Sequence, residues 1–349
     1  MASTGQKKRI GIMTGGGDAP GLNGIIESVV RSLRTESVEI VGIQDGFEGV
    51  FERRAITLSA TSVWGQHQQA GSILGASNKS RVKGREQEFL AGYKDLKLDG
   101  LVAAGGDGTF EGLSFVKNQI KVIGVPKTID NDLSGTDVTF GYDTACTVVA
   151  KSVQALRATA ETHRRFILVE AMGRTAGWIA LGGGLAAYAD VILIPERPFS
   201  REQLKKYLKD QMDQGRRGLL AVVAEGAKAQ GETARVAFHV KDYPQSERFG
   251  GIAESLARWA EAEVGWESRH VVLGHLQRSE YPTMNDRLLT LQMGAEVAKA
   301  VTENDWNKAV VIRQGQITRA PISDLMQPPR LISSSHPWVE IAEKIGIFI

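Results

Sequence analysis

Short apolar stretches alternate with helical patterns along nearly the whole chain, and few fold classes can accommodate this pattern. The stretches are rich in β-branched residues and bounded by glycine or proline, which is typical of buried strands. We predict strands at residues 9–13, 38–43, 101–104, 122–125, 166–170, 191–194, 219–224, 270–273 and 309–312. Strands that alternate with helices form βαβ units, so we expect an α/β fold with mostly parallel sheets and helices on both faces.

The chain length of 349 residues predicts two domains, because a single hydrophobic core rarely extends over so many residues. We place the division near Gly141, before a helix expected to begin at about Asp143. Residues 228–247 are polar and lack a regular period, so we expect surface loops there. The tail after Ile312 contains several prolines and is expected to run irregularly over the body of the protein.

Charge and cysteine content exclude several classes of protein. The net charge is +2, from 42 basic and 40 acidic residues, whereas proteins that bind nucleic acid concentrate Lys and Arg on one face. The single cysteine, Cys146, excludes a disulfide within the chain and is typical of a reducing compartment. No apolar run approaches the ~20 residues that span a bilayer, and the polar start of the chain does not resemble a signal peptide. We therefore expect a cytoplasmic protein that binds neither nucleic acid nor membrane.

Three predicted strands end in loops that suit phosphate binding. Residues 14–21 (TGGGDAPG) follow the first strand, residues 105–109 (GGDGT) follow the strand at 101–104, and residues 126–132 (PKTIDND) follow the next strand. Glycines between a strand and a helix let backbone N–H groups approach phosphate oxygens. The first loop is not a Walker loop, because no Gly-Lys-Ser/Thr follows it. Each loop alone is also compatible with a simple turn, but three in succession favour a ligand site.

Acidic side chains in these loops supply groups that phosphoryl transfer needs. Asp107 can hold Mg²⁺ through waters while the neighbouring amides face phosphates. Asp130 can act as a general base, Asp132 can orient it or bind metal, and Thr128 can bond a phosphate oxygen. Such a transfer depends on in-line positioning and neutralised charge more than on covalent help.

The sequence resembles the phosphofructokinase family over nearly its whole length. The resemblance rests on TGGGDAPGLN, GGDGT, PKTIDNDL, VEAMGRTAGWIAL and VLGHLQR followed by NDRLL, in the family's order and approximate spacing. NAD kinases and lipid kinases share GGDGT but lack the other segments. The resemblance implies the phosphofructokinase fold of two Rossmann-like three-layer domains. The donor- and Mg²⁺-binding domain would comprise residues 1–141 and 277–308, and the sugar-phosphate-binding domain residues 142–276 and 309–349.

The resemblance also implies a role for individual residues. The catalytic residues would be Asp130, Arg174, Thr128 and Asp132, with Asp130 as the base for the 1-hydroxyl of fructose 6-phosphate and Arg174 stabilising the transition state. The phosphoryl donor would bind Gly16, Gly17, Gly106, Asp107, Gly108, Thr109 and Lys127, with Asp107 holding Mg²⁺. The sugar phosphate would contact Thr128, Asp130, Arg165, Met172, Gly173, Arg174, Glu225, Arg269, His275 and Arg278. Arg165 and Arg269 would come from a neighbouring subunit, so the resemblance predicts a homotetramer or dimer with shared active sites.

Two positions bear on the phosphoryl donor. Gly108 favours ATP, because pyrophosphate enzymes of the family carry an Asp there that would crowd and repel the α-phosphate. Lys127 is typical of pyrophosphate enzymes, whereas familiar bacterial ATP enzymes have glycine. The combination resembles a mixed subgroup that includes ATP-dependent members, and we predict ATP on steric grounds. The alternatives are a pyrophosphate-dependent enzyme acting on fructose 6-phosphate or sedoheptulose 7-phosphate, and a non-catalytic, nucleotide-sensing subunit. Intact Asp107, Asp130, Asp132 and Arg174 argue against the latter.

The sequence departs from the family pattern at several places. Asn78 stands where the family has a phosphate-bridging arginine, and Ser279 and Glu280 replace two glycines. A regulatory effector site between subunits would use Arg31, Arg54, Arg157, Asp190, Arg216 and Arg217. Glu27 occupies a position where bacterial relatives have an arginine, so we expect weaker or different binding of anionic effectors.

Overall fold

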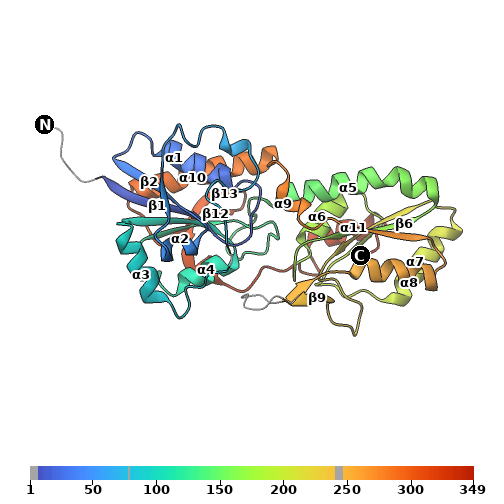
Figure 1. The fold of residues 1–349 in the computed structure, drawn as a ribbon. Coiled ribbons are helices and arrows are strands. Elements are labelled where there is room, and N and C mark those ends of the chain that lie inside the picture. Colours follow the sequence, from blue (N-terminus) through green and yellow to red (C-terminus); the bar gives the residue numbers. More distant parts are fainter. Residues whose placement is uncertain (1–6, 78, 240–246) are drawn as a thin grey trace.

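The computed structural model describes residues 7–77, 79–239 and 247–349, and the chain forms two lobes side by side (Figure 1). Each lobe is a sheet between two layers of helices. The first lobe holds a sheet in the order β13-β12-β5-β4-β1-β2-β3, in which only the outermost pairings, β13 with β12 and β2 with β3, are antiparallel. Its strands are β1 (Lys8–Thr14), β2 (Val38–Ile43), β3 (Ala55–Leu58), β4 (Gly100–Gly105), β5 (Val122–Pro126), β12 (Lys308–Arg313) and β13 (Gln316–Pro321).

The helices of the first lobe cover both faces of its sheet. One face carries α1 (Leu22–Ser32) and α10 (Met284–Thr302), and the other carries α2 (Phe47–Phe51), α3 (Glu86–Asp95) and α4 (Asp107–Ser114). Short 3₁₀ turns lie at η1 (Gln66–Gln68) and η2 (Ile322–Met326). Strand β4 is buried along its whole length, because helices cover both of its faces, and this explains its unbroken apolar sequence.

The second lobe has a smaller, fully parallel sheet in the order β11-β6-β8-β7. Its strands are β6 (Phe166–Ala171), β7 (Val191–Leu193), β8 (Leu219–Ala224) and β11 (Ser268–Val272). One face carries α5 (Tyr142–His163), α6 (Trp178–Ala186) and α11 (Pro337–Lys344), and the other carries α7 (Arg201–Asp213) and α8 (Ile252–Glu263). A separate antiparallel pair joins β9 (Val236–His239) to β10 (Glu247–Phe249). None of the helices in the described ranges is long and apolar enough to cross a bilayer.

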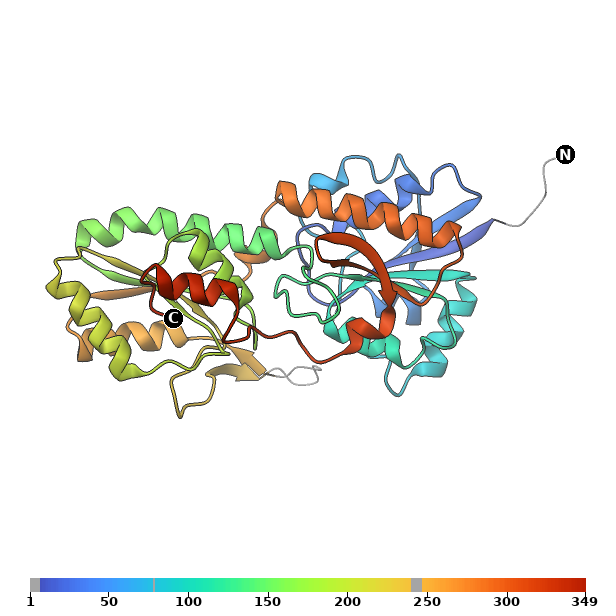
Figure 2. The ribbon, with the colours of Figure 1, turned by 180° about the vertical axis from the view of Figure 1, so that it is seen from behind.

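The chain passes between the two sheets three times: from β5 to α5 and β6, from β11 to β12, and from β13 to α11. The second passage contains the short helix α9 (Leu276–Ser279). The third is an extended segment that crosses from the end of η2 to α11, drawn in red in Figure 2. The two lobes are therefore connected by several segments rather than by one hinge.

The structure corrects parts of the predicted organisation. Each predicted strand is present, but residues 309–326 belong to the first lobe, because β12 pairs with β5, β13 pairs with β12, and Ile322 and Leu325 of η2 pack in the core of that lobe. The assignment of this stretch to the second domain was wrong. Residues 228–247, predicted as loops, include β9, while residues 240–246 lie outside the described part. The tail after Ile312 is also more regular than predicted, since it forms β13, η2 and α11.

Candidate active site

The three glycine-rich or acidic loops meet at one edge of the first sheet. Strands β1, β4 and β5 are parallel neighbours, so their carboxyl ends lie together. The Gly15 N–H donates to the Ala104 carbonyl (2.9 Å), and the Lys127 N–H donates to the Gly105 carbonyl (2.9 Å). Thr109 is buried against this junction, since a Cβ atom on Gly15 or Gly105 would come within 2.5 or 2.4 Å of its side chain. The loops can therefore meet only because these positions are glycine.

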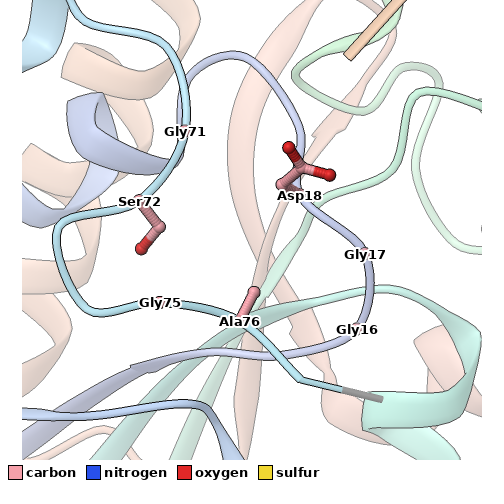
Figure 3. Close-up of a pocket in the computed structure, with 7 residues that line it drawn as sticks. All are labelled: Gly16, Gly17, Asp18, Gly71, Ser72, Gly75 and Ala76. Atoms are coloured by element: carbon pink, nitrogen blue, oxygen red, sulfur yellow. The ribbon is translucent and has the colours of Figure 1, made fainter. Parts of the chain in front are cut away.

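A pocket of about 380 Å³ opens beside the first loop. Gly16, Gly17 and Asp18 line one side, and a second loop, with Gly71, Ser72, Gly75 and Ala76, lines the other (Figure 3). Thr14 ties the two loops together, because its hydroxyl lies 2.9 Å from the Ser72 hydroxyl and donates to the Gly75 carbonyl at 2.5 Å. The sequence analysis connected this loop with the donor through Asn78, but it did not predict the lining residues, although their closely spaced glycines were a visible signal. Asn78, expected to replace a phosphate-binding arginine nearby, lies outside the described residues.

Two cationic side chains flank the Gly17 turn. Lys127 is buried, and its Nζ donates to the Gly17 carbonyl. Burial, with the nearby charge of Arg278, lowers the pKa of Lys127 to about 8. Arg278 Nη1 donates to the Asp18 carbonyl at 2.7 Å and would lie 3.2 Å from a Cβ on Gly17. Arg278, which was expected at the sugar phosphate, contacts the donor-side loop in this structure.

Asp130 and Asp132 are both buried in the loop after β5. Burial raises the pKa of Asp130, and burial together with the charges of Asp130 and Asp107 raises the pKa of Asp132 to about 7. Asp130 Oδ1 has no hydrogen-bond partner within the described parts of the chain, although the Asp130 N–H donates to Thr128 Oγ1 at 3.1 Å. A buried carboxylate oxygen without a hydrogen-bond partner costs folding free energy, and it is therefore typical of a group that binds a ligand.

Arg174 projects from the second lobe toward the first. Its N–H and that of Gly173 both donate to Glu225 Oε1, at 2.8 and 3.3 Å. Its guanidinium lies 3.6 Å from Asp107 Oδ2, so the second lobe reaches the donor-side carboxylate. Gly226 allows the loop that carries Arg174 to lie close to the backbone after Glu225, since a Cβ on Gly226 would be 2.0 Å from the Arg174 carbonyl oxygen. The arrangement places a permanent cation beside the carboxylates where the loops of the two lobes face each other, a region called the cleft below.

Glu225 is a third perturbed carboxyl in the cleft. Burial raises its pKa to about 7 against the opposing effect of its hydrogen bond from Arg174, and the charge of Asp130 adds to the shift. Met172, which precedes this loop, donates its N–H to Gln277 Oε1 at 3.3 Å, and Gln277 belongs to α9. Gln277 is fully buried and was not predicted as part of the site.

Contacts among these loops gather most of the predicted site residues at the cleft: Gly16, Gly17, Gly106, Asp107, Gly108, Thr109, Lys127, Thr128, Asp130, Asp132, Met172, Gly173, Arg174, Glu225 and Arg278. His275 is exposed and directly precedes α9 as its N-cap residue. Arg165 and Arg269 lie at the amino-terminal ends of β6 and β11, where both pair with Glu267 (2.8 and 2.7 Å). One chain therefore does not bring these two arginines to the other residues.

The predicted effector residues fall into separate groups within one chain. Asp190 accepts a hydrogen bond from Arg216 and lies 3.8 Å from Arg157, and Arg217 is exposed beside this group in the second lobe. Arg54 pairs with Asp45 (2.5 Å) in the first lobe.

Arg31 pairs with Glu27 at 3.0 Å and stacks on Trp64, also in the first lobe. Glu27 is buried, and it also accepts hydrogen bonds from the backbones of Gly65 (3.2 Å) and His67 (2.8 Å). Although burial opposes ionisation, these hydrogen bonds lower the pKa of Glu27. Glu27 therefore anchors η1 and Gly65 before it, a role that its sequence position did not indicate.

In this site the glycine loops and acidic side chains of the first lobe face an arginine of the second. Such an arrangement is that of an enzyme that transfers phosphoryl groups. A sequence model of the family described as Phosphofructokinase matches residues 9–301. The chain is 38% identical over 323 residues to ATP-dependent 6-phosphofructokinase 3 of Streptomyces coelicolor, covering 91% of this chain and 95% of that protein. It is 39% identical over 332 residues to an ATP-dependent 6-phosphofructokinase of Mycobacterium tuberculosis, covering 94% and 97%. The chain belongs to the phosphofructokinase family.

Solved structures agree with this fold. The phosphofructokinase of Saccharomyces cerevisiae superposes with a TM-score of 0.81 at 27% identity, covering 91% of this chain and 44% of that one. This chain thus spans less than half of the yeast chain. A pyrophosphate-dependent phosphofructokinase from Marinobacter aquaeolei superposes with a TM-score of 0.82 at 20% identity, covering 98% and 92%. At that identity the likeness shows the fold alone, and the α/β prediction is confirmed.

Proposed function

We propose that this chain is an ATP-dependent 6-phosphofructokinase, which transfers the γ-phosphoryl group of MgATP to the 1-hydroxyl of fructose 6-phosphate. The observation that carries the proposal is the buried Asp130 carboxylate, whose Oδ1 lacks a partner in the described structure and lies in the cleft that Arg174 enters. The names of the similar bacterial proteins support both the donor and the acceptor. The first lobe would bind the donor and the second the sugar phosphate.

The residues in the cleft can perform each part of this transfer. Asp130 accepts the proton of the sugar's 1-hydroxyl. At the same time the hydroxyl oxygen forms a bond to the γ-phosphorus, and the bond between that phosphorus and the ADP oxygen breaks. Arg174 stabilises the charge that spreads over the transferred oxygens. Glycine loops at Gly17 and Gly106 present backbone N–H groups to the donor phosphates. Asp132 and Thr128 orient the base and the phosphate.

Asp107 fits the role of a Mg²⁺ ligand that works together with the donor. Its side chain is half exposed at the mouth of the cleft. Within the described ranges, no group of three or more His, Cys, Asp or Glu side chains is arranged to hold a metal. Mg²⁺ usually keeps several waters and is bound through one or two carboxylates plus substrate phosphates, which matches a single exposed carboxylate. The bound ion would neutralise the phosphate charge.

Gly108 supports ATP as the donor. A Cβ atom built on Gly108 meets no heavy atom within 4 Å, so the space in front of the loop is open. Lys127 is the observation that favours the second candidate, a pyrophosphate-dependent enzyme, because its Nζ lies at the Gly17 turn. A matrix of ATP and pyrophosphate against fructose 6-phosphate and sedoheptulose 7-phosphate separates the two. Turnover of fructose 6-phosphate with ATP is expected, and turnover with pyrophosphate alone would replace our proposal by the second candidate.

The Asp130→Ser variant tests the base within this function. We expect its kcat to fall by about 10³-fold or more, while binding of fructose 6-phosphate, measured by calorimetry, stays within a few-fold of the wild type. A rate close to that of the wild type would remove Asp130 from the role of base.

We further propose that the active site is completed between subunits of a dimer or tetramer. Arg165 and Arg269 lie away from the cleft of their own chain, which supports a role in a neighbouring chain's site. Mixing the inactive variants Asp130→Ser and Arg269→Ala, after dissociation and reassociation, should restore part of the activity, because a mixed dimer holds one intact site. If the two variants are each inactive and their mixture is inactive as well, the proposal that the subunits share active sites is contradicted.

A further inference from the structure

Arg330, in the segment that crosses from η2 to α11, touches both lobes at the cleft. Its backbone N–H donates to the Asp132 carbonyl at 2.7 Å, and its Nη2 donates to the Asn131 carbonyl at 2.8 Å. These carbonyls directly follow Asp130 in the chain. Its guanidinium carbon also lies 4.3 Å from the centre of the Trp178 ring.

Trp178 connects Arg330 to the loop that carries Arg174. It is the first residue of α6 and lies four residues after Arg174 in the chain, and its indole N–H donates to the Arg330 carbonyl at 2.9 Å. The Trp178 ring is buried, and its carbonyl accepts the Tyr142 hydroxyl at 3.0 Å, so the ring is a fixed support. Arg330 is therefore held from both sides.

Glu196 makes a second connection between the crossing segment and the Arg174 loop. Its carboxylate accepts the Gly177 N–H at 3.0 Å and the Ile332 N–H at 3.1 Å. The segment from Arg330 to Ile332 thus binds the base-bearing loop of one lobe and the arginine-bearing loop of the other.

The Asn131 backbone is a conformation that needs such support. Asn131 has φ 52°, in the left-handed region, and Asp130 and Asp132 lie on either side of it. The Thr139 N–H donates a hydrogen bond to the side-chain oxygen of Asn131 at 3.0 Å, and Arg330 donates one to the Asn131 carbonyl. These two contacts fix the side chain and the carbonyl of Asn131, and so they support the backbone on which Asp130 lies.

Stability alone does not explain an arginine here. Arg330 Nε is buried and has no hydrogen-bond partner within the described residues, which is unfavourable for folding. Arg330 is half-buried, so its guanidinium also loses part of its hydration beside the Trp178 ring. A role in orienting the catalytic loops accounts for its presence.

We infer that Arg330 is a positioning residue for phosphoryl transfer, which sets the Asp130 loop against the Arg174 loop across the two lobes. The inference rests on the proposed function. Arg330 does not touch the reacting atoms; it acts through Asn131, Asp132 and Trp178. An error of about 1 Å in such a geometry costs about 10²-fold in rate, so the guanidinium should affect kcat far more than substrate binding.

The test compares Arg330→Met, which keeps an unbranched apolar stem, with Arg330→Lys, which keeps the charge, in the full-length protein. We expect Arg330→Met to lower kcat about 10- to 100-fold with KM for fructose 6-phosphate within about threefold, and Arg330→Lys to recover part of the loss. The matched control is Arg319→Met, because Arg319 is likewise half-buried with an Nε that lacks a hydrogen bond within the described residues, but it pairs with Glu296, Glu303 and Asp305 in the first lobe. The control should lose thermal stability and keep its kcat.

A double-mutant cycle with Asp130→Ser distinguishes positioning from a structural effect. If Arg330 places Asp130 against Arg174, part of its effect needs Asp130, so Arg330→Met should lower the residual kcat of Asp130→Ser by a clearly smaller factor than it lowers the wild-type kcat. Multiplicative losses, or a kcat of Arg330→Met within about threefold of the wild type, would overturn the inference. Failure of the wild-type protein to convert fructose 6-phosphate and ATP would instead refute the proposed function.

Poor folding of Arg330→Met would not end the test. Trp178→Phe keeps an aromatic ring beneath the guanidinium but removes the N–H that holds the Arg330 carbonyl. We expect it to lower kcat about three- to tenfold, again by a clearly smaller factor in the Asp130→Ser background. An unchanged kcat in Trp178→Phe would count against the inference.

Discussion

Replacing Gly108 by Asp adds a charge to the donor site without disturbing the fold. Gly108 is the second residue of α4, and a Cβ there meets no heavy atom within 4 Å. Asp has a better helix propensity than Gly, and a carboxylate in the first turn interacts well with the helix dipole. The free energy of unfolding should therefore stay within about 1 kcal/mol of the wild type.

The same carboxylate should strongly impair the use of ATP. It would stand beside Asp107, where the donor phosphates are proposed to lie. Two unit charges 4 Å apart repel by about 4 kcal/mol at an effective dielectric constant of about 20. Exposure at the cleft mouth reduces this to about 2–3 kcal/mol, which corresponds to about 10²-fold in kcat/KM for ATP.

Steady-state kinetics and thermal unfolding of matched variants measure this effect. Gly108→Asn has the shape of Asp without its charge, and Gly108→Ala adds only the Cβ. We expect a small loss of kcat/KM for ATP with Ala and Asn and a large one with Asp, which decreases as salt rises. Equal losses for Asn and Asp would show a steric cause instead of repulsion. An Asp variant that uses ATP normally would refute the placement of the donor at Gly108.

Three further substitutions test other parts of the site. Gly226→Ala should lower kcat about 10- to 100-fold in rate assays, because its Cβ would lie 2.0 Å from the Arg174 carbonyl oxygen and displace that loop. Asp286→Ala should destabilise the protein by about 3 kcal/mol in thermal unfolding, because the Asp286 carboxylate accepts the N–H groups of Gly141 and Thr144, both at 2.9 Å, and Asp286→Asn should be milder. The folded pKa of Glu225, about 7, exceeds the ordinary 4.5, so the folded protein binds the proton more tightly and this residue's contribution to stability falls as pH rises from about 4.5 to 7. Glu225→Gln should remove up to about 3 kcal/mol of that fall, measured by denaturant unfolding at pH 5 and pH 8, and an unchanged pH dependence would contradict the shift.

The sequence predicted the strands well where burial on both faces leaves an apolar run. Strand β4 shows this, since every one of its residues is buried. Strand β3 was missed, because it is a short edge strand with two exposed residues and carries no such run. Strand β13 was also missed, although Gln314 and Gly315, with φ of 52° and 73°, form the two-residue turn of a hairpin. Asn-Gly would have been a clear signal at that turn, whereas Gln-Gly is not.

The positions of the catalytic groups within the first lobe were predictable from the order of its strands. The distance between these groups and those of the second lobe was not. Asp107 and Asp130 follow adjacent parallel strands, so the order of the strands alone brings them to one edge. The approach of the second lobe depends instead on single contacts between distant segments, such as that of Arg330 with Asn131, 199 residues away. In the sequence, Arg330 is one basic residue among many and carries no local pattern. Its place between the Asp130 and Arg174 loops depends on the folded path of the segment that crosses between the lobes. The geometry of the transfer therefore has to be tested at Arg330 as well as at Asp130.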